Sequence, residues 1–260
     1  MSGVLLITGG SRGIGAATAR LAARQGYEIA INYRAEAEAA AALLAEIEVA
    51  GNRAMAVQAD VSRQEEVERL FREVDGRLGR ATALVNAAGI DGGPPARVAE
   101  LEQAALERLL AVNVIGTMLC CREAVRRMST AHGGGGGAIV NVSSMAATIG
   151  GRPGRSAYAA SKAAVDSFSV GLAKEVAQEG IRVNAIRPGM TLTDMIDAVR
   201  RDPERHAQIA ATIAMNRCAE AEEIAQAVLW LLSDEASFVS GAILDASGGG
   251  FMLAPVGPRS

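Results

Sequence analysis

The chain alternates short aliphatic runs with long alanine-rich runs from its first residues nearly to its last, and this alternation limits the fold more than any other feature. Runs with the length and β-branched character of strands are Val4–Thr8, Glu28–Asn32, Ala54–Gln58, Ala83–Asn86, Ala138–Ser143, Arg182–Arg187 and Ala242–Asp245. Longer runs with helical character are Ile14–Gln25, Glu36–Ala50, Gln64–Arg77, Glu100–Met128, Ala157–Gln178 and Ala221–Leu232. Repeated βα units predict an α/β fold whose parallel sheet has about seven strands, with helices on both faces.

Length and charge narrow the class of protein. No linker interrupts the alternation over 260 residues, so we expect a single domain over residues 1–260, with 250–260 as a C-terminal tail. The formal net charge of -3 provides no basic field of the kind that binds phosphate backbones. The sequence therefore favours a small-molecule partner over nucleic acid.

The cysteines and the first residues bear on the compartment. Cys120 and Cys121 are adjacent, and Cys218 stands alone, so the spacing indicates neither a disulfide framework nor a metal site. The first strand begins after three residues, without the basic and apolar regions of a signal peptide. No uncharged run approaches membrane-spanning length. We expect a cytoplasmic protein that neither binds a metal nor crosses a membrane.

A glycine-rich turn joins the first predicted strand to the first predicted helix. It contains Gly9, Ser11, Arg12, Gly13, Ile14 and Gly15. Glycines let the backbone turn tightly and approach a pyrophosphate, and the helix that follows presents free N–H groups to the anion. The spacing is not G-x-G-x-x-G, but strand, turn and helix stand in the order that a dinucleotide site requires.

The end of the second strand reads Asn32-Tyr33-Arg34. An NAD enzyme usually places a carboxylate there to hold the ribose 2'-hydroxyl. Here Arg12 and Arg34 are positioned to flank a 2'-phosphate, and guanidinium groups suit phosphate oxygens. The sequence thus predicts a preference for NADP(H) over NAD(H); the alternative is that both arginines are solvated surface charges.

Two further strand ends carry polar or small residues. Asp60 and Val61 follow the third strand, and the sequence Asn86-Ala87-Ala88-Gly89 ends the fourth. Each has a structural alternative, since Asp60 can cap a turn and Asn86 can be a satisfied turn residue. Only the series of strand ends as a whole favours a ligand.

The residues suited to proton chemistry lie later in the chain. Tyr158 and Lys162 are four residues apart in a helical run, so their side chains share one face, and a neighbouring ammonium lowers the pKa of a phenol. Ser144 follows the fifth strand, where a hydroxyl can orient a carbonyl oxygen or simply cap a turn. Asn113 lies inside the long helical run, where asparagine is a mediocre helix former whose amide could hold a water at a local distortion.

Together these residues resemble the classical short-chain dehydrogenase/reductase family from Val4 to about Gly249. The matching motifs are Thr8–Gly15, Asn86–Gly89, Asn113, Ser144, Tyr158-x-x-x-Lys162, Pro188-Gly189, Ser240-Gly241 and Asp245. The resemblance implies a Rossmann-type, doubly wound sheet and transfer of hydride between nicotinamide and a carbonyl or alcohol substrate.

The resemblance also implies roles for individual residues. Tyr158 would be the general acid/base, Lys162 would tune it and bind the nicotinamide ribose, Ser144 would orient the substrate, and Asn113 would anchor a water relay to Lys162. Asp60 would approach adenine, and Asn86–Gly89 the inner ribose. Pro188, Gly189, Thr191 and Thr193 would meet the carboxamide and phosphate region. The sequence departs from the family at Ala87, where asparagine is more common, and in a Ser144–Tyr158 spacing that is one residue longer than usual.

Two irregular segments remain. Residues 190–217 follow the sixth strand and are positioned to cover a substrate. This segment is fairly apolar, which makes a small sugar the less favoured substrate. Its apolar residues are Met190, Met195, Ile196, Ile209, Ile213 and Met215. Its arginines, Arg200, Arg201 and Arg205, either meet an acidic carrier protein or are ordinary solvated charges. The run Gly133–Gly137 is expected to be a flexible surface connection.

The sequence leaves the substrate open among a 3-oxoacyl thioester, a sugar or polyol, and a ketone. A second class of function is a catalytically silent protein that senses NADP(H) or serves as a scaffold. The two runs Glu100–Met128 and Ala157–Gln178 have apolar residues on more than one face. With the resemblance, this predicts a homotetramer.

Overall fold

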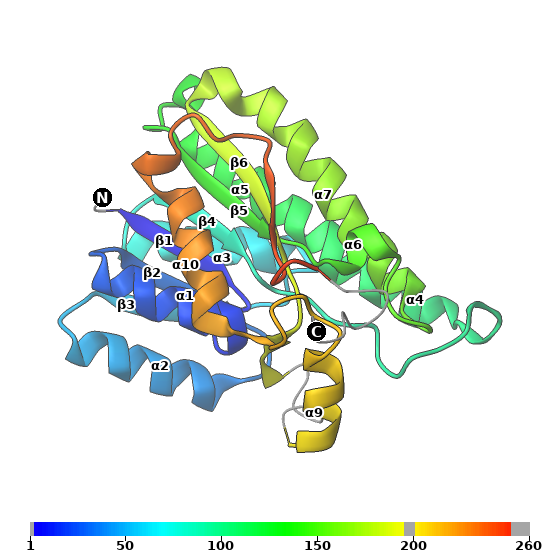
Figure 1. Ribbon diagram of the computed structural model, residues 1–260. Coiled ribbons are helices and arrows are strands. Elements are labelled where there is room, and N and C mark those ends of the chain that lie inside the picture. Colours follow the sequence, from blue (N-terminus) through cyan, green and yellow to red (C-terminus); the bar gives the residue numbers. More distant parts are fainter. Residues whose placement is uncertain (1–2, 195–200, 251–260) are drawn as a thin grey trace.

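The computed structural model describes residues 3–194 and 201–250, and within them a seven-stranded sheet forms the centre of the fold (Figure 1). The strands pair in the order β3-β2-β1-β4-β5-β6-β9, and every pairing is parallel. Their bounds are β1 Val4–Thr8, β2 Glu28–Tyr33, β3 Ala54–Gln58, β4 Ala81–Asn86, β5 Gly137–Val142, β6 Ile181–Pro188 and β9 Ile243–Ala246. A separate pair joins β7 (Thr191–Leu192) to β8 (Ala219–Glu220).

Helices cover both faces of this sheet. One face packs against α1 (Gly13–Arg24), α2 (Ala37–Val49) and α10 (Ala221–Leu232). The other packs against α3 (Gln64–Arg77), α5 (Thr117–Met128) and α7 (Ser156–Val176). The shorter helices are α4 (Gln103–Leu110), α6 (Ala146–Ile149) and α9 (Pro203–Ala210), and α9 projects from the sheet near the start of α10 (Figure 1). The doubly wound α/β fold expected from the sequence is confirmed.

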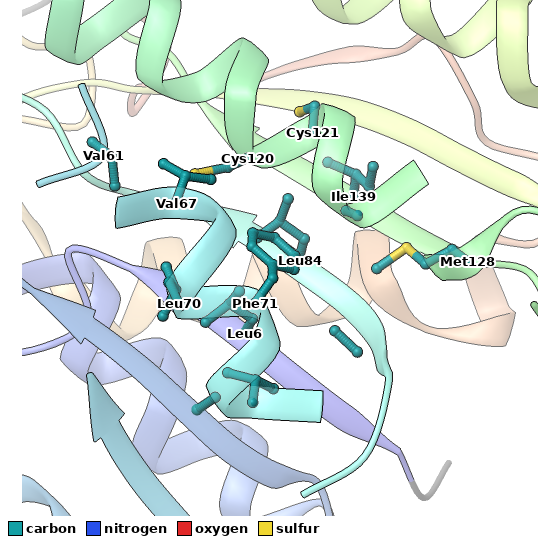
Figure 2. Close-up of a cluster of buried hydrophobic side chains, with 14 of the residues drawn as sticks. Leu6, Val61, Val67, Leu70, Phe71, Leu84, Cys120, Cys121, Met128 and Ile139 are labelled. Atoms are coloured by element: carbon teal, nitrogen blue, oxygen red, sulfur yellow. The ribbon is translucent and has the colours of Figure 1, made fainter. Parts of the chain in front are cut away.

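The core beneath α3 and α5 shows why aliphatic runs suffice for this fold. Leu6 of β1, Leu84 of β4 and Phe71 of α3 are fully buried and meet in one cluster (Figure 2). Cys120 and Cys121 of α5 lie in the same layer as free, fully buried thiols. Burial raises the pKa of both thiols, that of Cys121 to about 12, so they act as small apolar residues.

The strand order reverses between β1 and β4, and this reversal locates the functional edge. Strand β1 continues to β2 on one side and pairs with β4 on the other, in a register that places Thr8 beside Asn86 and Asn86 beside Asn141. Ligands of open α/β sheets bind outside the carboxyl ends of strands at such a point. The residues that follow β1, β4 and β5 are therefore brought to one edge.

The long helix expected over Glu100–Met128 is interrupted. A 3₁₀ turn at Val98–Glu100 is followed by extended backbone at Leu101, and α4 begins only at Gln103. A π-helical segment, η2 (Ala111–Gly116), then separates α4 from α5. The helix is thus distorted at Asn113, and the Thr117 hydroxyl donates to the Asn113 carbonyl oxygen at 2.9 Å.

The run Gly133–Gly137 is a packed turn and not the flexible connection that we expected. Gly134 N–H donates to the Ser129 carbonyl and Gly136 N–H to the Met128 carbonyl, both at 2.8 Å. A side chain at Gly134 would collide with the backbone of Met128, and one at Gly136, where φ is +82°, would lie 2.5 Å from the Gly180 carbonyl oxygen. Glycine is needed here because backbone packs directly on backbone.

One helical run in the described part of the chain, Gln103–Met128, is long and apolar enough to cross a membrane by length and composition. In the fold its α5 half packs against β4 and α3, which is the behaviour of a core helix.

Candidate active site at the carboxyl edge of the sheet

The glycine turn closes tightly around the end of β1. Gly9 and Gly13 have positive φ angles of 61° and 54°. A Cβ at Gly9 would lie 2.8 Å from the backbone nitrogen of Ala88, so the turn packs directly on the strand end at Asn86–Gly89. The first turn of α1 holds no acidic residue, and its N-cap, Arg12, makes no side-chain capping bond, so its N–H groups are available to an anion.

The other turn residues divide between packing and exposure. Ser11 is buried, and Ile14 packs where α1 meets α10, while Gly15 lies close beneath Gly9. Arg12 is exposed and forms loose ion pairs of 3.4 Å with Glu36 and 3.9 Å with Asp194. Its charge lies in the solvent above the turn.

The end of β2 also combines a buried residue with an exposed one. The Asn32 side chain donates to the carbonyl oxygens of Ala59 at 2.8 Å and Val57 at 3.3 Å, so its amide holds β2 to β3. Tyr33 is partly buried against the core beneath α1 and α2. Arg34 is exposed, and its backbone carbonyl accepts from Gln58. Of the residues predicted to hold the cofactor, Arg12 and Arg34 are therefore the two with exposed positive charges on this side of the glycine turn.

Asp60 is occupied by neighbours. Its carboxylate accepts from Ser62 and from Arg108, the latter at 2.8 Å. Burial acts to raise the pKa of Asp60, but the bonds from Ser62 and Arg108 outweigh it and hold the pKa below its usual range. Val61 is buried against Gly116. The Asp60 side chain thus holds the turn before α3, and its approach to adenine stays a prediction.

Asn86 belongs to a buried polar chain that runs through the sheet. Its amide donates to Asn141 Oδ1 at 2.9 Å, and the Asn141 amide donates to the Ser169 hydroxyl at 2.8 Å. The Thr8 hydroxyl accepts from the Ala88 N–H at 3.2 Å, which ties the end of β1 to the turn that follows β4. The sequence analysis did not single out Asn141 or Ser169, although an asparagine inside an otherwise aliphatic strand is a visible signal.

Asn113 holds the backbone of Ile90 from both sides. Its Oδ1 accepts from the Ile90 N–H and its Nδ2 donates to the Ile90 carbonyl, each at 2.9 Å, and Nδ2 also donates to Ser161 Oγ at 3.0 Å. A Cβ at Gly89 would lie 3.4 Å from both Asn113 Oδ1 and Lys162 Nζ. Asn113 of the π-helical segment and Lys162 of α7 thus both lie next to Gly89.

Tyr158, Lys162 and Ser144 meet where α7 passes the end of β5. Lys162 is only 6% exposed; its ammonium donates to the Val142 carbonyl at 2.8 Å and lies 5.9 Å from the centre of the Tyr158 ring. Ser144 Oγ accepts from the Ala146 N–H. Ser143 Oγ instead donates to the Lys162 carbonyl and is buried, so Ser144 is the more accessible of the two serines.

The pKa of Tyr158 differs from the sequence expectation. Burial raises it, with a further increase from the Asp91 charge, and these effects outweigh the bond to Ser144 and the charge of Arg155. The Lys162 ammonium is directed to the Val142 carbonyl oxygen, and it lies 5.9 Å from the centre of the Tyr158 ring. Burial lowers the pKa of Lys162 to about 8, against the opposing charge of Asp166.

The segment after β6 begins over the glycine turn. Pro188 ends β6, and the Thr191 hydroxyl donates to the Gly189 carbonyl at 3.2 Å. The Thr193 methyl group would lie 3.3 Å from a Cβ at Gly13. Ile209 and Ile213 are buried with Cys218, while Met190 and Leu192 pack against them, so much of the apolar character of this segment is used internally. Met195, Ile196 and Arg200 lie outside the described residues.

A pocket opens beside Tyr158, and two charged residues that line it, Asp91 and Arg155, were not predicted from the sequence. It lies between residues 91–109 and the segment Gly154–Tyr158. Arg155 forms an ion pair of 3.1 Å with Asp91 and donates to the carbonyl oxygens of Asp91 and Gly93. The extra residue between Ser144 and Tyr158 was the available signal, because a changed loop length changes what lines a site. Within the described ranges, no three His, Cys, Asp or Glu side chains are arranged to hold a metal ion.

The parallel sheet, the glycine turn at its switch point and the Tyr158–Lys162 pair define an oxidoreductase of the Rossmann type. The chain belongs to the short-chain dehydrogenase/reductase family: residues 9–250 match the family profile described as enoyl-(acyl carrier protein) reductase.

Relatives match over nearly the full length. The uncharacterized oxidoreductase YgfF of Escherichia coli is 47% identical, covering 95% of this chain and 99% of that protein. The cis-4-hydroxycyclohexanecarboxylate dehydrogenase of Sinomonas cyclohexanicum is 40% identical, with 95% of each covered. Among solved structures, a blue fluorescent protein from a metagenomic library, in complex with NADPH, has a TM-score of 0.87 and 34% identity, covering 95% of this chain and 97% of that one.

Proposed function

We propose that this oxidoreductase reduces a carbonyl compound with NADPH, or oxidises the corresponding alcohol, with Tyr158 as general acid/base. The observation that carries the proposal is the convergence of Tyr158, Ser144 and Lys162 at the carboxyl edge of the sheet, next to the glycine turn. NADPH supplies the hydride when it is bound.

The residues of the chain divide the remaining work. Tyr158 gives its proton to the carbonyl oxygen as hydride arrives at the carbon. Ser144 donates to the same oxygen and orients it. Lys162 binds a ribose hydroxyl and stabilises the phenolate left on Tyr158. Asn113 holds the backbone of Ile90 in place through two hydrogen bonds.

The residues present fit an NADP(H) cofactor. Gly9 and Gly13 keep side chains out of the turn, and the N–H groups at the start of α1 face an anion. Arg12 and Arg34 supply the positive charge that a 2'-phosphate requires. The NADPH complex of the metagenomic relative supports this choice of cofactor.

A silent NADP(H) sensor is the alternative. A sensor has no need for a phenol and an ammonium brought together in a buried site, so the geometry favours the enzyme. Oxidation of NADPH, followed at 340 nm with a panel of ketones, tests the proposal. Tight NADPH binding with no turnover of any carbonyl compound would favour the sensor.

We also propose a cytoplasmic homotetramer of single-domain subunits. Exposed apolar residues support an assembly: Leu110, Ile115 and Met118 on the α4–α5 run, Trp230 near the end of α10, and Phe238 in the loop after it. Sedimentation at micromolar concentration tests it, and a monomer would contradict it.

A further inference from the structure

The pocket beside Tyr158 has an apolar interior. Leu101, Leu106 and Leu109 line it on the α4 side, and Pro94 and Pro95 line it on the loop that follows β4. Leu109 is buried, and a Cβ at Gly92 would lie 3.5 Å from it, so the loop packs on the helix and closes this side. The interior suits an apolar substrate body.

The charges of the pocket are carboxylates with one exception. Asp91, Glu100 and Glu102 line it together with Arg155, which is the one cation among its described lining residues. Three carboxylates and one guanidinium leave two negative charges. Glu102, at the N-cap of α4, makes no capping bond with its side chain, so its carboxylate is not engaged there.

Arg155 is not free to bind a substrate anion. Its Nη2 lies 3.1 Å from the Asp91 carboxylate, and its Nη1 donates to the carbonyl oxygens of Asp91, at 2.9 Å, and of Gly93. A substrate carboxylate would have to displace Asp91 and leave that carboxylate unpaired beside it. Binding of an anion here therefore costs an existing ion pair.

We propose that this pocket selects uncharged carbonyl compounds with apolar bodies and discriminates against those that carry a carboxylate or phosphate close to the reacting carbon. The inference rests on the proposed function and names its substrate class. The field of Asp91 reaches the reacting group, because the Asp91 charge contributes to raising the pKa of the Tyr158 hydroxyl. A substrate anion in the same space meets the same repulsion.

The test compares substrates that are matched in size and differ in charge. Suitable pairs are 3-oxobutanamide with 3-oxobutanoate, and 4-oxocyclohexanecarboxamide with 4-oxocyclohexanecarboxylate. For wild type, kcat/KM with NADPH should favour the neutral member by at least about 10-fold at low ionic strength, since each carboxylate at a separation of about 7 Å contributes roughly a 3-fold effect through water. Added salt should narrow the ratio.

Variants of the carboxylates that line the pocket test whether these residues cause the selectivity. Glu100→Gln with Glu102→Gln should reduce the ratio of neutral to anionic kcat/KM by about 10-fold, mainly through KM of the anion. Asp91→Asn should also reduce it, because it releases Arg155. The control, Glu48→Gln with Glu175→Gln, removes two exposed carboxylates at the C-terminal ends of α2 and α7, at the opposite edge of the sheet, and should leave the ratio unchanged.

The inference would be overturned if wild type used the neutral and the anionic substrate equally well. It would also be overturned if the ratio of neutral to anionic kcat/KM were the same in the pocket variants and in the control. Either result would leave the proposed function intact. If no carbonyl compound oxidises NADPH, the proposed function itself fails. The two failures are therefore distinguishable.

Discussion

The two ends of the candidate site hold their charges in opposite ways. At the glycine-turn end, meaning the Gly9–Gly15 turn with Arg34, the cations are in solvent, and the Arg12 side chain is 57% exposed. At the α7 end, meaning Ser144, Tyr158 and Lys162 with Asn113, the ammonium is buried and bonded to Val142. An exposed charge costs little to fold and is easily exchanged, whereas a buried one is costly and depends on its neighbours.

This difference indicates that the choice of cofactor and the rate of the chemical step can vary independently of each other. Substitutions at the glycine-turn end should change the choice of cofactor without changing stability. Substitutions at the α7 end should change turnover and stability together.

The largest effect is expected at Tyr158. Tyr158→Phe should lower kcat by about 10²- to 10⁴-fold, because the general acid is lost, while NADPH binding measured by fluorescence remains near that of wild type. Tyr27→Phe removes a hydroxyl from a tyrosine outside the α7 end and should keep the turnover of folded enzyme. Near-native turnover by Tyr158→Phe would remove this residue from the mechanism.

Lys162 should reveal the cost of its burial through pH. Its folded pKa of about 8 lies below the usual 10.5, so between these values the unfolded chain binds more protons and stability rises with pH. The free energy of unfolding of wild type should therefore rise by up to about 3 kcal/mol relative to Lys162→Met from pH 8 to pH 10.5. Urea unfolding of both proteins across this range measures it, and parallel curves would mean that Lys162 is better solvated than its contacts indicate.

Arg34 should control the choice of cofactor. A bond to a charged partner contributes about 1.5–3 kcal/mol, so Arg34→Ala should weaken NADPH binding by roughly 10- to 150-fold and barely affect NADH. Arg34→Asp should invert the preference, because the carboxylate repels the phosphate and accepts from the ribose hydroxyls of NADH. The measurement is kcat/KM for both cofactors at fixed ionic strength.

Arg24→Asp is the matched control, since Arg24 is exposed at the far end of α1 and the charge change is the same. A cofactor ratio in Arg34→Asp that equals the ratio in Arg24→Asp would show that Arg34 is an ordinary surface charge.

The smallest effect is expected at Glu36. Its pair with Arg12, at 3.4 Å between half-exposed side chains, competes with a phosphate for the guanidinium. Glu36→Gln should tighten NADPH binding by about 2- to 5-fold, the range of an exposed ion pair, and the gain should fade in high salt. Glu38→Gln, one charge further along α2, should change the Kd less; an equal gain in both variants would point to net charge rather than to Arg12.

The sequence predicted the fold because the length and apolar pattern of each run indicate a strand or a helix without knowledge of distant contacts. It also predicted which residues gather at the sheet edge, since motifs in βα units follow strand ends. Asp91 and Arg155 could not be paired in advance: the residues are 64 positions apart, and both lie in loops whose paths have no periodicity. The pKa of Tyr158 was mispredicted for a related reason, because the spacing of Tyr158 and Lys162 shows a shared helix face but not how deeply either residue is buried.

The π-helical segment at Ala111–Gly116 has a consequence for how this chain can change over generations. A π-helical turn holds one residue more than an α-helical turn, so the extra residue widens the helix locally. The loss of one residue here would restore a regular α-helix in which Cys120, Cys121 and Ala124 keep their places in the core, but Asn113 would be displaced from Ile90. A single residue thus separates a helix that only supports the sheet from one that also fixes the loop after β4.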